Sequence, residues 1–149
     1  MPADSPAMAC IIPALRYRDA AAAVDWLCQA FGFERHLVVP GEGGKVVHAQ
    51  LTLGPEAGAN GSGMVMLDSD SGGDYDRLLR DPQAAGGVTQ APYVVVADVD
   101  AHHDRAKAAG AVIVMAPEDQ EHGGRLYACK DPEGHLWNFG SYDPWADTT

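Results

Sequence analysis

The fold is decided by the stretch Pro13-Ala-Leu-Arg-Tyr-Arg-Asp19, which returns in varied form as Pro92-Tyr-Val-Val-Val-Ala-Asp98. Each copy reads as a short strand that runs from a proline to an aspartate six positions later, where an Ala-rich segment begins. A unit that recurs within one chain indicates an architecture assembled from copies of the same supersecondary structure. The sequence therefore predicts two related modules.

Both aspartates precede a segment with the periodicity of a helix. In residues 19–31, apolar side chains recur at the spacing of three and four that gives a helix one buried face. Gly32 follows and suits the position just beyond a helix C-terminus. The second helix is predicted at residues 99–109, with Asp98 or Asp100 as its N-terminal cap.

Three strand-like runs, separated by turns, follow each predicted helix. They are residues 34–40, 45–53 and 63–67 in the first module, and residues 111–116, 125–130 and 135–140 in the second. The prediction is an α+β fold of two tandem βαβββ modules, at about residues 10–68 and 91–143. A linker rich in Asp, Ser and Gly, at about residues 69–90, joins them into a single domain over residues 1–149.

The composition narrows the class of partner. The chain of 149 residues carries a formal net charge of -11 and has ten Lys and Arg residues, whereas nucleic-acid binding requires clustered basic side chains. The same charge disfavours an anionic membrane surface, and no segment approaches the ~18 uninterrupted apolar residues of a membrane span. We therefore expect neither a nucleic acid nor a membrane as partner.

Cysteine usage favours a reducing compartment. The chain has Cys10, Cys28 and Cys129, an odd number without a CxxC motif or the Cys/His spacing of a zinc site. The first ten residues lack the basic and apolar regions of a secretory signal. The prediction is a reduced, cytoplasmic protein.

Several short motifs follow one another in a characteristic order. They are Pro13-x-Leu-x-Tyr-x-Asp19, Ala30-Phe31-Gly32-Phe33, Val47-His48-Ala49, Ala97-Asp98-Val99-Asp100-Ala101, Ala108-Ala109-Gly110-Ala111 and Asp131-Pro132-Glu133-Gly134-His135-Leu136-Trp137. In order and spacing they resemble the vicinal oxygen chelate superfamily, and within it the glyoxalase-like subgroup. This superfamily includes glyoxalase I, bleomycin-resistance proteins and extradiol dioxygenases. The resemblance covers roughly residues 10–143.

The resemblance implies that each module curls its strands into a half-cup and that two half-cups close around one small-molecule site. It also implies a homodimer, because half-cups of the superfamily commonly pair across a subunit interface. Metalloenzymes of the superfamily take ligands from the first and last strands of each module, at positions that are here Ile12, Met66, Ala91 and Asn138. An amide oxygen alone cannot hold a divalent ion. We expect a cup without metal or other cofactor, with a divalent metal held by relocated ligands such as His48 as the alternative.

Strand alternation predicts which side chains line the cup. In residues 45–53 the apolar set Val47, Ala49, Leu51 and Leu53 suits a helix-covered core, which leaves His48, Gln50 and Thr52 for the cup. We align the turn Gly54-Pro55-Glu56 with Asp131-Pro132-Glu133 to compare the two modules. In this alignment Arg125, Tyr127 and Cys129 occupy alternate positions that match the cup side of residues 45–53, so they are predicted to face the cup. Residues at alternate strand positions from the superfamily's ligand positions lie on the same face of their strand. This adds Arg16 and several apolar residues to the predicted lining.

The predicted ligand-binding residues are His48, Gln50, Met64, Met66, Tyr93, Arg125, Tyr127 and Asn138. Trp137 and Phe139 have the opposite parity to Asn138 and are predicted to pack in the core. His102 is predicted to lie on the solvent-exposed face of the second helix.

Two classes of function fit a lining that is mostly apolar and aromatic with a few polar anchors. The first is a metal-free protein that binds a small aromatic or amphipathic molecule, similar to bleomycin-resistance members. The second is a glyoxalase-type lyase or isomerase, either metal-dependent or with His48 and Tyr127 as acid–base catalysts. His48 is alternatively a structural histidine. Arg125 either anchors an anionic group or pairs with an acidic residue.

Overall fold

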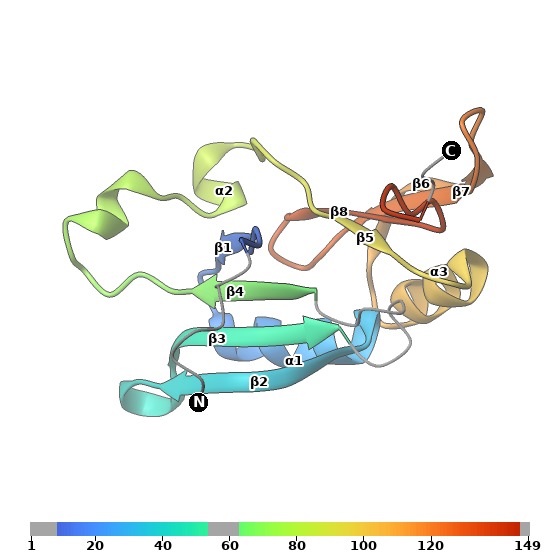
Figure 1. The fold of residues 1–149 in the computed structure, drawn as a ribbon. Helices are drawn as coiled ribbons and strands as arrows, with labels where there is room; N and C mark the ends of the chain where they lie inside the picture. The colour runs from blue at the N-terminus through green and yellow to red at the C-terminus, as the bar shows by residue number, and fades with distance from the viewer. Residues whose placement is uncertain (1–8, 54–62, 147–149) are drawn as a thin grey trace, which may run out of the picture.

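Two βαβββ modules make up the protein, whose computed structural model describes residues 9–53 and 63–146 (Figure 1). The first contains β1 (Ala14–Arg16), α1 (Ala20–Phe31), β2 (Phe33–Pro40), β3 (Val46–Leu53) and β4 (Met64–Asp68). The second contains β5 (Tyr93–Val95), α3 (Val99–Ala108), β6 (Val112–Asp119), β7 (Arg125–Lys130) and β8 (Leu136–Gly140). The prediction of two tandem modules is confirmed, and each helix begins directly after the aspartate of its repeat.

Each module forms a four-stranded mixed sheet with the same topology. The strand order is β1-β4-β3-β2 in the first sheet and β5-β8-β7-β6 in the second. In both sheets the first strand pairs in parallel with the last, and the other neighbours are antiparallel. Ala14 lies opposite Met66 and Tyr93 lies opposite Asn138, so these two pairs occupy equivalent places.

Local sequence determines where the two long helices begin. Asp19 Oδ1 accepts a hydrogen bond from the Ala22 amide at 3.0 Å, and Asp98 Oδ1 accepts one from the Ala101 amide at 3.0 Å. An N-cap of this kind stabilises a helix by roughly 1 kcal/mol. Gly32 ends α1 with φ 84°, a left-handed conformation that disfavours any residue with a Cβ. Among the described residues, no helix combines the length and the apolar character that crossing a membrane requires.

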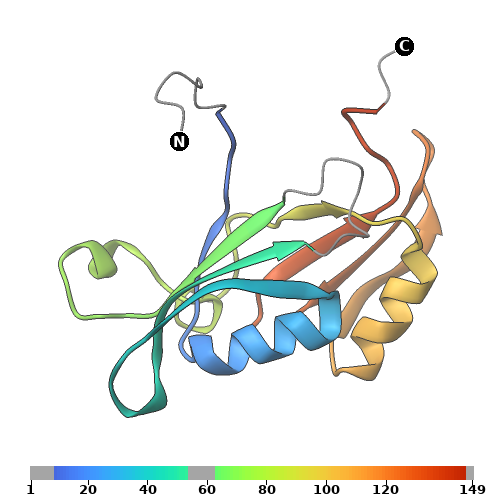
Figure 2. The same cartoon turned by 60° about the horizontal axis from the view of Figure 1, so that its bottom comes forward.

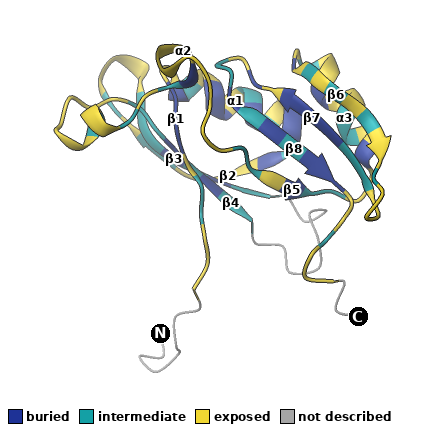
Figure 3. Ribbon diagram, turned by 90° about the horizontal axis from the view of Figure 1, so that it is seen from above, coloured by how far each residue is buried: buried dark blue, intermediate teal, exposed yellow. Residues whose placement is uncertain are grey.

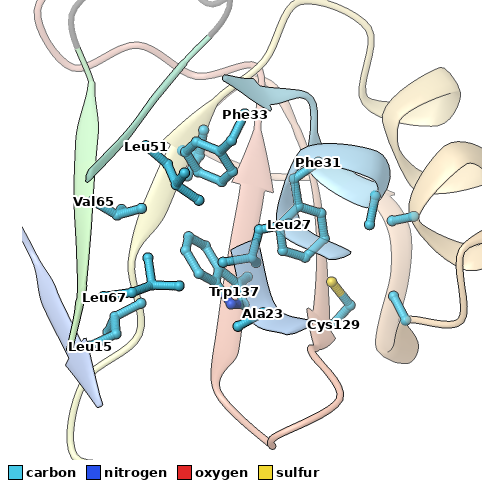
Figure 4. Packing of buried hydrophobic residues seen from close by; sticks show 14 of the residues in the cluster. Leu15, Ala23, Leu27, Phe31, Phe33, Leu51, Val65, Leu67, Cys129 and Trp137 are labelled. Carbon is cyan, nitrogen blue, oxygen red and sulfur yellow. The ribbon is translucent and has the colours of Figure 1, made fainter. Parts of the chain in front are cut away.

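Helices α1 and α3 lie side by side and cover the same side of both sheets (Figure 2). The core fills the space between helices and strands (Figure 4), where Leu27, Leu51 and Trp137 are each 0% exposed. Burial of one such leucine contributes roughly 1.5–3 kcal/mol. Because residues of both modules share this core, the modules stabilise one another.

Phe31, at the end of α1, joins the core of the first module to the aromatic side chains of β8. Its ring centroid lies 4.6 Å from that of Phe139 and 5.3 Å from that of Trp137. Both β8 aromatics are 0% exposed. The prediction that Trp137 and Phe139 pack beneath the helices is confirmed.

The turn between β7 and β8 is hydrogen-bonded to the end of β1. The Glu133 carboxylate accepts the amides of Arg18 at 2.6 Å and Asp19 at 2.9 Å, just before α1 begins. A negative charge is stabilising at a helix N-terminus. His135 Nε2 lies 2.7 Å from the carbonyl oxygen of Arg16 and donates to it, because a carbonyl only accepts. The turn that carries one of the sequence motifs therefore connects the modules.

The segment between the modules has more structure than a plain linker. It contains η2 (Tyr75–Leu78) and α2 (Pro82–Ala85), and the β2–β3 connection contains η1 (Glu42–Gly44). Most of the segment is exposed (Figure 3). Asp76 nevertheless pairs with Arg16 of β1, with 2.7 Å between Oδ1 and Nη2. An acidic residue of the predicted linker thus attaches this segment to the first sheet.

Candidate functional site

A row of polar side chains crosses the side of the first sheet that faces away from α1. The register places Arg16 of β1 opposite Asp68 of β4, and Asp68 opposite His48 of β3. The intervening residues of β3 and β4, such as Ala49 and Leu67, are buried in the core. We define the cup face of the first sheet as Arg16, His48, Gln50, Met64, Met66 and Asp68.

His48 is held between two polar neighbours on this face. Its Nδ1 lies 2.7 Å from Asp68 Oδ1, and its Nε2 lies 3.2 Å from Gln50 Nε2. In the neutral ring Nδ1–H donates to the carboxylate, and Nε2 accepts from the Gln50 amide. The side chains of His48 and Asp68 are 28% and 39% exposed. A ligand on the cup face therefore meets an imidazole with a fixed tautomer and orientation, which suits hydrogen bonding and proton transfer.

Asp68 is the member of this site that the sequence interpretation missed. Strand parity was available as a signal, because Asp68 follows Met64 and Met66 at alternate positions of β4. Its partnership with His48 depends on the register between two strands, which the alternation of one strand does not determine. Arg16 was placed in the lining without a role, and the structure gives it a partner, Asp76.

The equivalence of the two sheets corrects the predicted lining of the second. Ala128 of β7 lies opposite Asn138, as Gln50 of β3 lies opposite Met66. Ala128, rather than Tyr127, is therefore the counterpart of Gln50, and the predicted alignment is off by one residue. Because side chains alternate with a period of two, a shift of one residue moves every side chain of β7 to the opposite face of the sheet. Gly54-Pro55-Glu56, on which the alignment depended, lies outside the described residues.

Tyr127 lies on the helix side of β7, so its predicted place in the cup was wrong. It is 0% exposed, and its hydroxyl lies 2.5 Å from Nδ1 of His102. His102 Nε2 lies 3.1 Å from the Phe31 carbonyl oxygen and donates to it, which leaves Nδ1 to accept from Tyr127. Burial raises the pKa of Tyr127 far above its ordinary value and lowers the pKa of His102. The predicted exposure of His102 was wrong too, since it links α1, α3 and β7.

Arg125 also lies off the cup. Its Nε is 3.2 Å from Asp100 Oδ1, and its Nη1 is 3.1 Å from Asp119 Oδ1. Hydrogen bonds to Asp119 and then to Asp100 raise the pKa of Arg125. The sequence left two roles open for Arg125, an anchor for an anionic group or a partner of an acidic residue. In the structure Arg125 pairs with acidic residues.

The remaining predicted residues lie on the cup sides of the two sheets. His48, Gln50, Met64 and Met66 come together on the first sheet, where all four are partly buried. Asn138 of the second sheet is partly buried, with its Nδ2 at 3.5 Å from the Pro92 carbonyl oxygen. Tyr93 is 42% exposed and donates its hydroxyl to the carbonyl oxygen of Tyr142 at 2.6 Å.

The positions that metalloenzymes of the superfamily use do not form a donor set here. They are Ile12, Met66, Ala91 and Asn138, of which only Asn138 offers a side-chain oxygen. Within residues 9–53 and 63–146, no three side chains of His, Cys, Asp or Glu come together as an ion site would require. Divalent transition metals prefer imidazole, thiolate and carboxylate ligands, so these four residues do not fit that metal.

Comparison with known proteins finds relatives over most of the chain. The family described as the Glyoxalase/Bleomycin resistance protein/Dioxygenase superfamily matches residues 11–139. The crystal structure of TioX from Micromonospora sp. ML1 is 36% identical with a TM-score of 0.67, and the match covers 89% of this chain and 98% of TioX. An uncharacterized protein of Mycobacterium bovis, Mb0911c, is 38% identical over 128 residues, which are 86% of this chain and 80% of that protein.

A more distant structure has the same fold. The bleomycin resistance determinant encoded on transposon Tn5 is 20% identical, with a TM-score of 0.62 over 91% of this chain and 99% of that one. The tandem arrangement of βαβββ modules is therefore shared well beyond the range of clear sequence similarity.

Proposed function

Because the chain belongs to the glyoxalase/bleomycin resistance protein/dioxygenase superfamily, we propose that its cup face binds a small aromatic or amphipathic organic molecule without a metal ion. The observation that carries this proposal is the His48–Asp68 pair, 2.7 Å apart, beside the partly buried Met64 and Met66. Pockets for organic molecules combine an apolar lining with a few fixed polar groups. The cup face of the first sheet has that composition.

Polar and apolar groups have separate roles in this proposal. On binding, the ligand takes the place of the Gln50 amide at Nε2 of His48, and that amide then donates to the same polar atom of the ligand. Asp68 keeps the imidazole oriented. Met64 and Met66 contact the aromatic or aliphatic part, because thioether side chains are polarizable and adapt to the shape of a ligand.

The proposed metal-free state rests on the chemistry of the four positions described above. We expect elemental analysis of the purified protein to find no stoichiometric transition metal. About one zinc, iron, nickel or manganese per chain, removed by a chelator together with ligand binding, would overturn this part of the proposal.

We also propose that the protein is a homodimer. Apolar side chains on the cup sides of both sheets are solvent-exposed, with Leu37 at 44%, Tyr93 at 42% and Val112 at 60%. A second copy that covers these surfaces removes apolar area from water. Analytical ultracentrifugation at micromolar concentration should give twice the chain mass of 15.7 kDa. A species of one chain mass contradicts the dimer.

The second candidate function is a glyoxalase-type lyase or isomerase with His48 as general base. The observation that favours it is the Asp68 carboxylate on Nδ1, which stabilises the imidazolium formed when Nε2 takes a proton. Tyr127 has no part in this candidate, because it faces the helices. Turnover of a bound compound, lost in a His48→Phe variant that still binds it, would favour the enzyme over the binding protein.

Fluorescence titration with 2-naphthol, a neutral aromatic alcohol, tests the binding proposal. We expect saturable binding that falls at least tenfold in Met66→Lys, because an ammonium group in an apolar contact loses its hydration. Leu78→Lys is the matched control, since Leu78 is 79% exposed on η2 and outside the cup face. Absence of saturable binding to the wild type, or equal affinity in a folded Met66→Lys variant, contradicts the proposal.

A further inference from the structure

Arg16 is a buried cation with an incomplete set of partners. Its side chain is 8% exposed, and its Nη2 pairs with Asp76 Oδ1 at 2.7 Å. Nε and Nη1 are buried and have no hydrogen-bond partner among the residues that the structure describes. Buried polar groups in folded proteins are nearly always hydrogen-bonded, and an unpaired donor on a charged group is especially unfavourable.

Asp76 does not satisfy the remaining donors because it is engaged elsewhere. Its Oδ2 accepts hydrogen bonds from the Ser71 hydroxyl at 2.8 Å and from the amides of Ser71 and Gly73, each at 3.1 Å. These contacts hold the carboxylate of Asp76, a residue of η2, against the loop that precedes this helix. The guanidinium of Arg16 thus has a fixed position but two nitrogens, with three N–H groups between them, that have no partner among the described residues.

Arg16 lines a cavity of about 900 Å³ at one end of the first sheet. The cavity is bounded by the end of β1, by the β2–β3 connection and by the segment that contains η2 and α2. These last two segments project beyond the same end of the sheet (Figure 1). Arg16 is the one cup-face residue in the lining, which does not include His48, Gln50 or Met66. The cavity therefore adjoins the cup face at Arg16 and extends away from the ligand site proposed above.

The cavity is electrostatically unlike the rest of the protein. Five of the ten basic residues of the chain line it, but only four of the 21 acidic residues do. The basic residues are Arg16, Arg18, Lys45, Arg77 and Arg80. Each of the four acidic side chains accepts hydrogen bonds from backbone amides of its own segment, as a helix cap or within a loop. In a chain of net charge -11, this lining carries a small excess of positive charge.

We propose that this cavity binds a small molecule with an oxyanion group, a carboxylate or a phosphate, through the free donors of Arg16. Hydrogen bonds from a guanidinium to such groups are charge-assisted and are among the stronger ones in proteins. The other basic side chains of the lining add attraction for a negative ligand. This inference does not depend on what His48, Gln50 and Met66 bind.

Titration with inorganic phosphate and, separately, with acetate tests the proposal in the full-length protein. The readouts are Tm and the ¹⁵N-resolved Nε–H resonance of Arg16, assigned by its loss in Arg16→Lys. We expect at least one anion to raise Tm and move the resonance saturably, beyond the effect of sodium chloride at equal ionic strength. A response to phosphate alone identifies a phosphoryl ligand, and a response to acetate alone identifies a carboxylate ligand.

Variants locate the response. Arg16→Met should weaken the binding of the active anion by tenfold or more. Arg35→Met, which removes a half-exposed arginine paired with Asp25 on the outside of the first module, should leave it unchanged. If Arg16→Met does not fold, Lys45→Met, which changes an exposed residue of the same lining, should weaken it several-fold. The proposal is overturned if neither anion acts beyond sodium chloride, or if these variants bind as the wild type does.

Discussion

Tyr17, in the first module, donates its hydroxyl hydrogen bond to Oδ2 of Asp131 in the second module, 114 positions along the chain, over 2.5 Å. Asp131 Oδ2 also accepts from Trp137 Nε1 at 3.1 Å, and Oδ1 accepts the amides of Glu133 and His135, each at 3.0 Å. Burial and then the Asp131 charge raise the pKa of Tyr17 well above its ordinary value. Tyr17 and Asp131 belong to two of the sequence motifs that carry the family resemblance. These motifs therefore supply a hydrogen bond that connects the two modules of the protein.

Removal of this hydroxyl should destabilise the fold. Tyr17 and Asp131 are 1% and 3% exposed, so in Tyr17→Phe no water replaces the lost donor to the carboxylate. A buried hydrogen bond to a charged group contributes roughly 1.5–3 kcal/mol, and we expect urea unfolding to show a loss of that size. Tyr75→Phe, at a residue 72% exposed, should have no effect. A Tyr17→Phe protein as stable as the wild type would show that the contact contributes nothing to the union of the modules.

His102 should make stability depend on pH. Burial lowers its pKa below the ordinary 6.5, so the unfolded chain binds the proton more tightly than the folded chain does. The stability that neutral His102 contributes is fully present above pH 6.5 and is lost as the pH falls through the pKa of the folded state. The free energy of unfolding should therefore fall less between about pH 8 and pH 5 in His102→Gln than in the wild type.

The matched control for this measurement is His36→Gln, because His36 is exposed on β2. It should keep the pH dependence of the wild type. If His102→Gln has the same slope as the wild type, the titration of His102 is not linked to folding.

Cys129 should be inert to alkylation while the protein is folded. It is 0% exposed, and burial, followed by the charge of Asp131, raises its pKa to about 12. Thiolate is the reactive form, so iodoacetamide near neutral pH should modify the exposed Cys10 and leave Cys129 unmodified until urea unfolds the chain. Mass spectrometry of peptides locates the adducts. Rapid modification of Cys129 in the native protein would contradict its burial.

The elements were predictable because each depends on local sequence. The aspartates that cap α1 and α3, Gly32 at the end of α1, and the alternation in β3 are all recorded within short windows. The alternation also separated His48 from the helix-covered Ala49 and Leu51 without knowledge of the sheet. The side on which His48 lies in the structure is the side predicted for it.

The side chains that face the cup were harder to predict in the second module. Their positions in β7 were inferred from the first module by aligning two turns. That alignment assumes turns of equal length, and an error of one residue reverses every side chain of β7. A signal within β7 itself was weak, since Tyr127, Ala128 and Cys129 are consecutive and all three are buried. Contacts such as His48–Asp68 and Tyr17–Asp131 depend on strand register and module packing, which no single window of sequence contains.

The role of His48 can be separated from its contribution to the fold by changing the ligand along with the protein. The hydroxyl of 2-naphthol can donate to Nε2 in place of the Gln50 amide, whereas naphthalene has the same rings and no hydroxyl. Loss of one hydrogen bond is worth on the order of 1 kcal/mol, about fivefold in affinity, so wild type should bind 2-naphthol better than naphthalene by more than solubility differences explain. In His48→Phe, which keeps a ring at this position, that preference should disappear while naphthalene affinity is retained.

The stability of the same variant is the second readout. Because His48 and Asp68 are both partly exposed, the free energy of unfolding should change by less than about 1 kcal/mol. If His48 serves only the fold, the reverse holds: stability falls, and the preference for the hydroxyl is the same in both proteins.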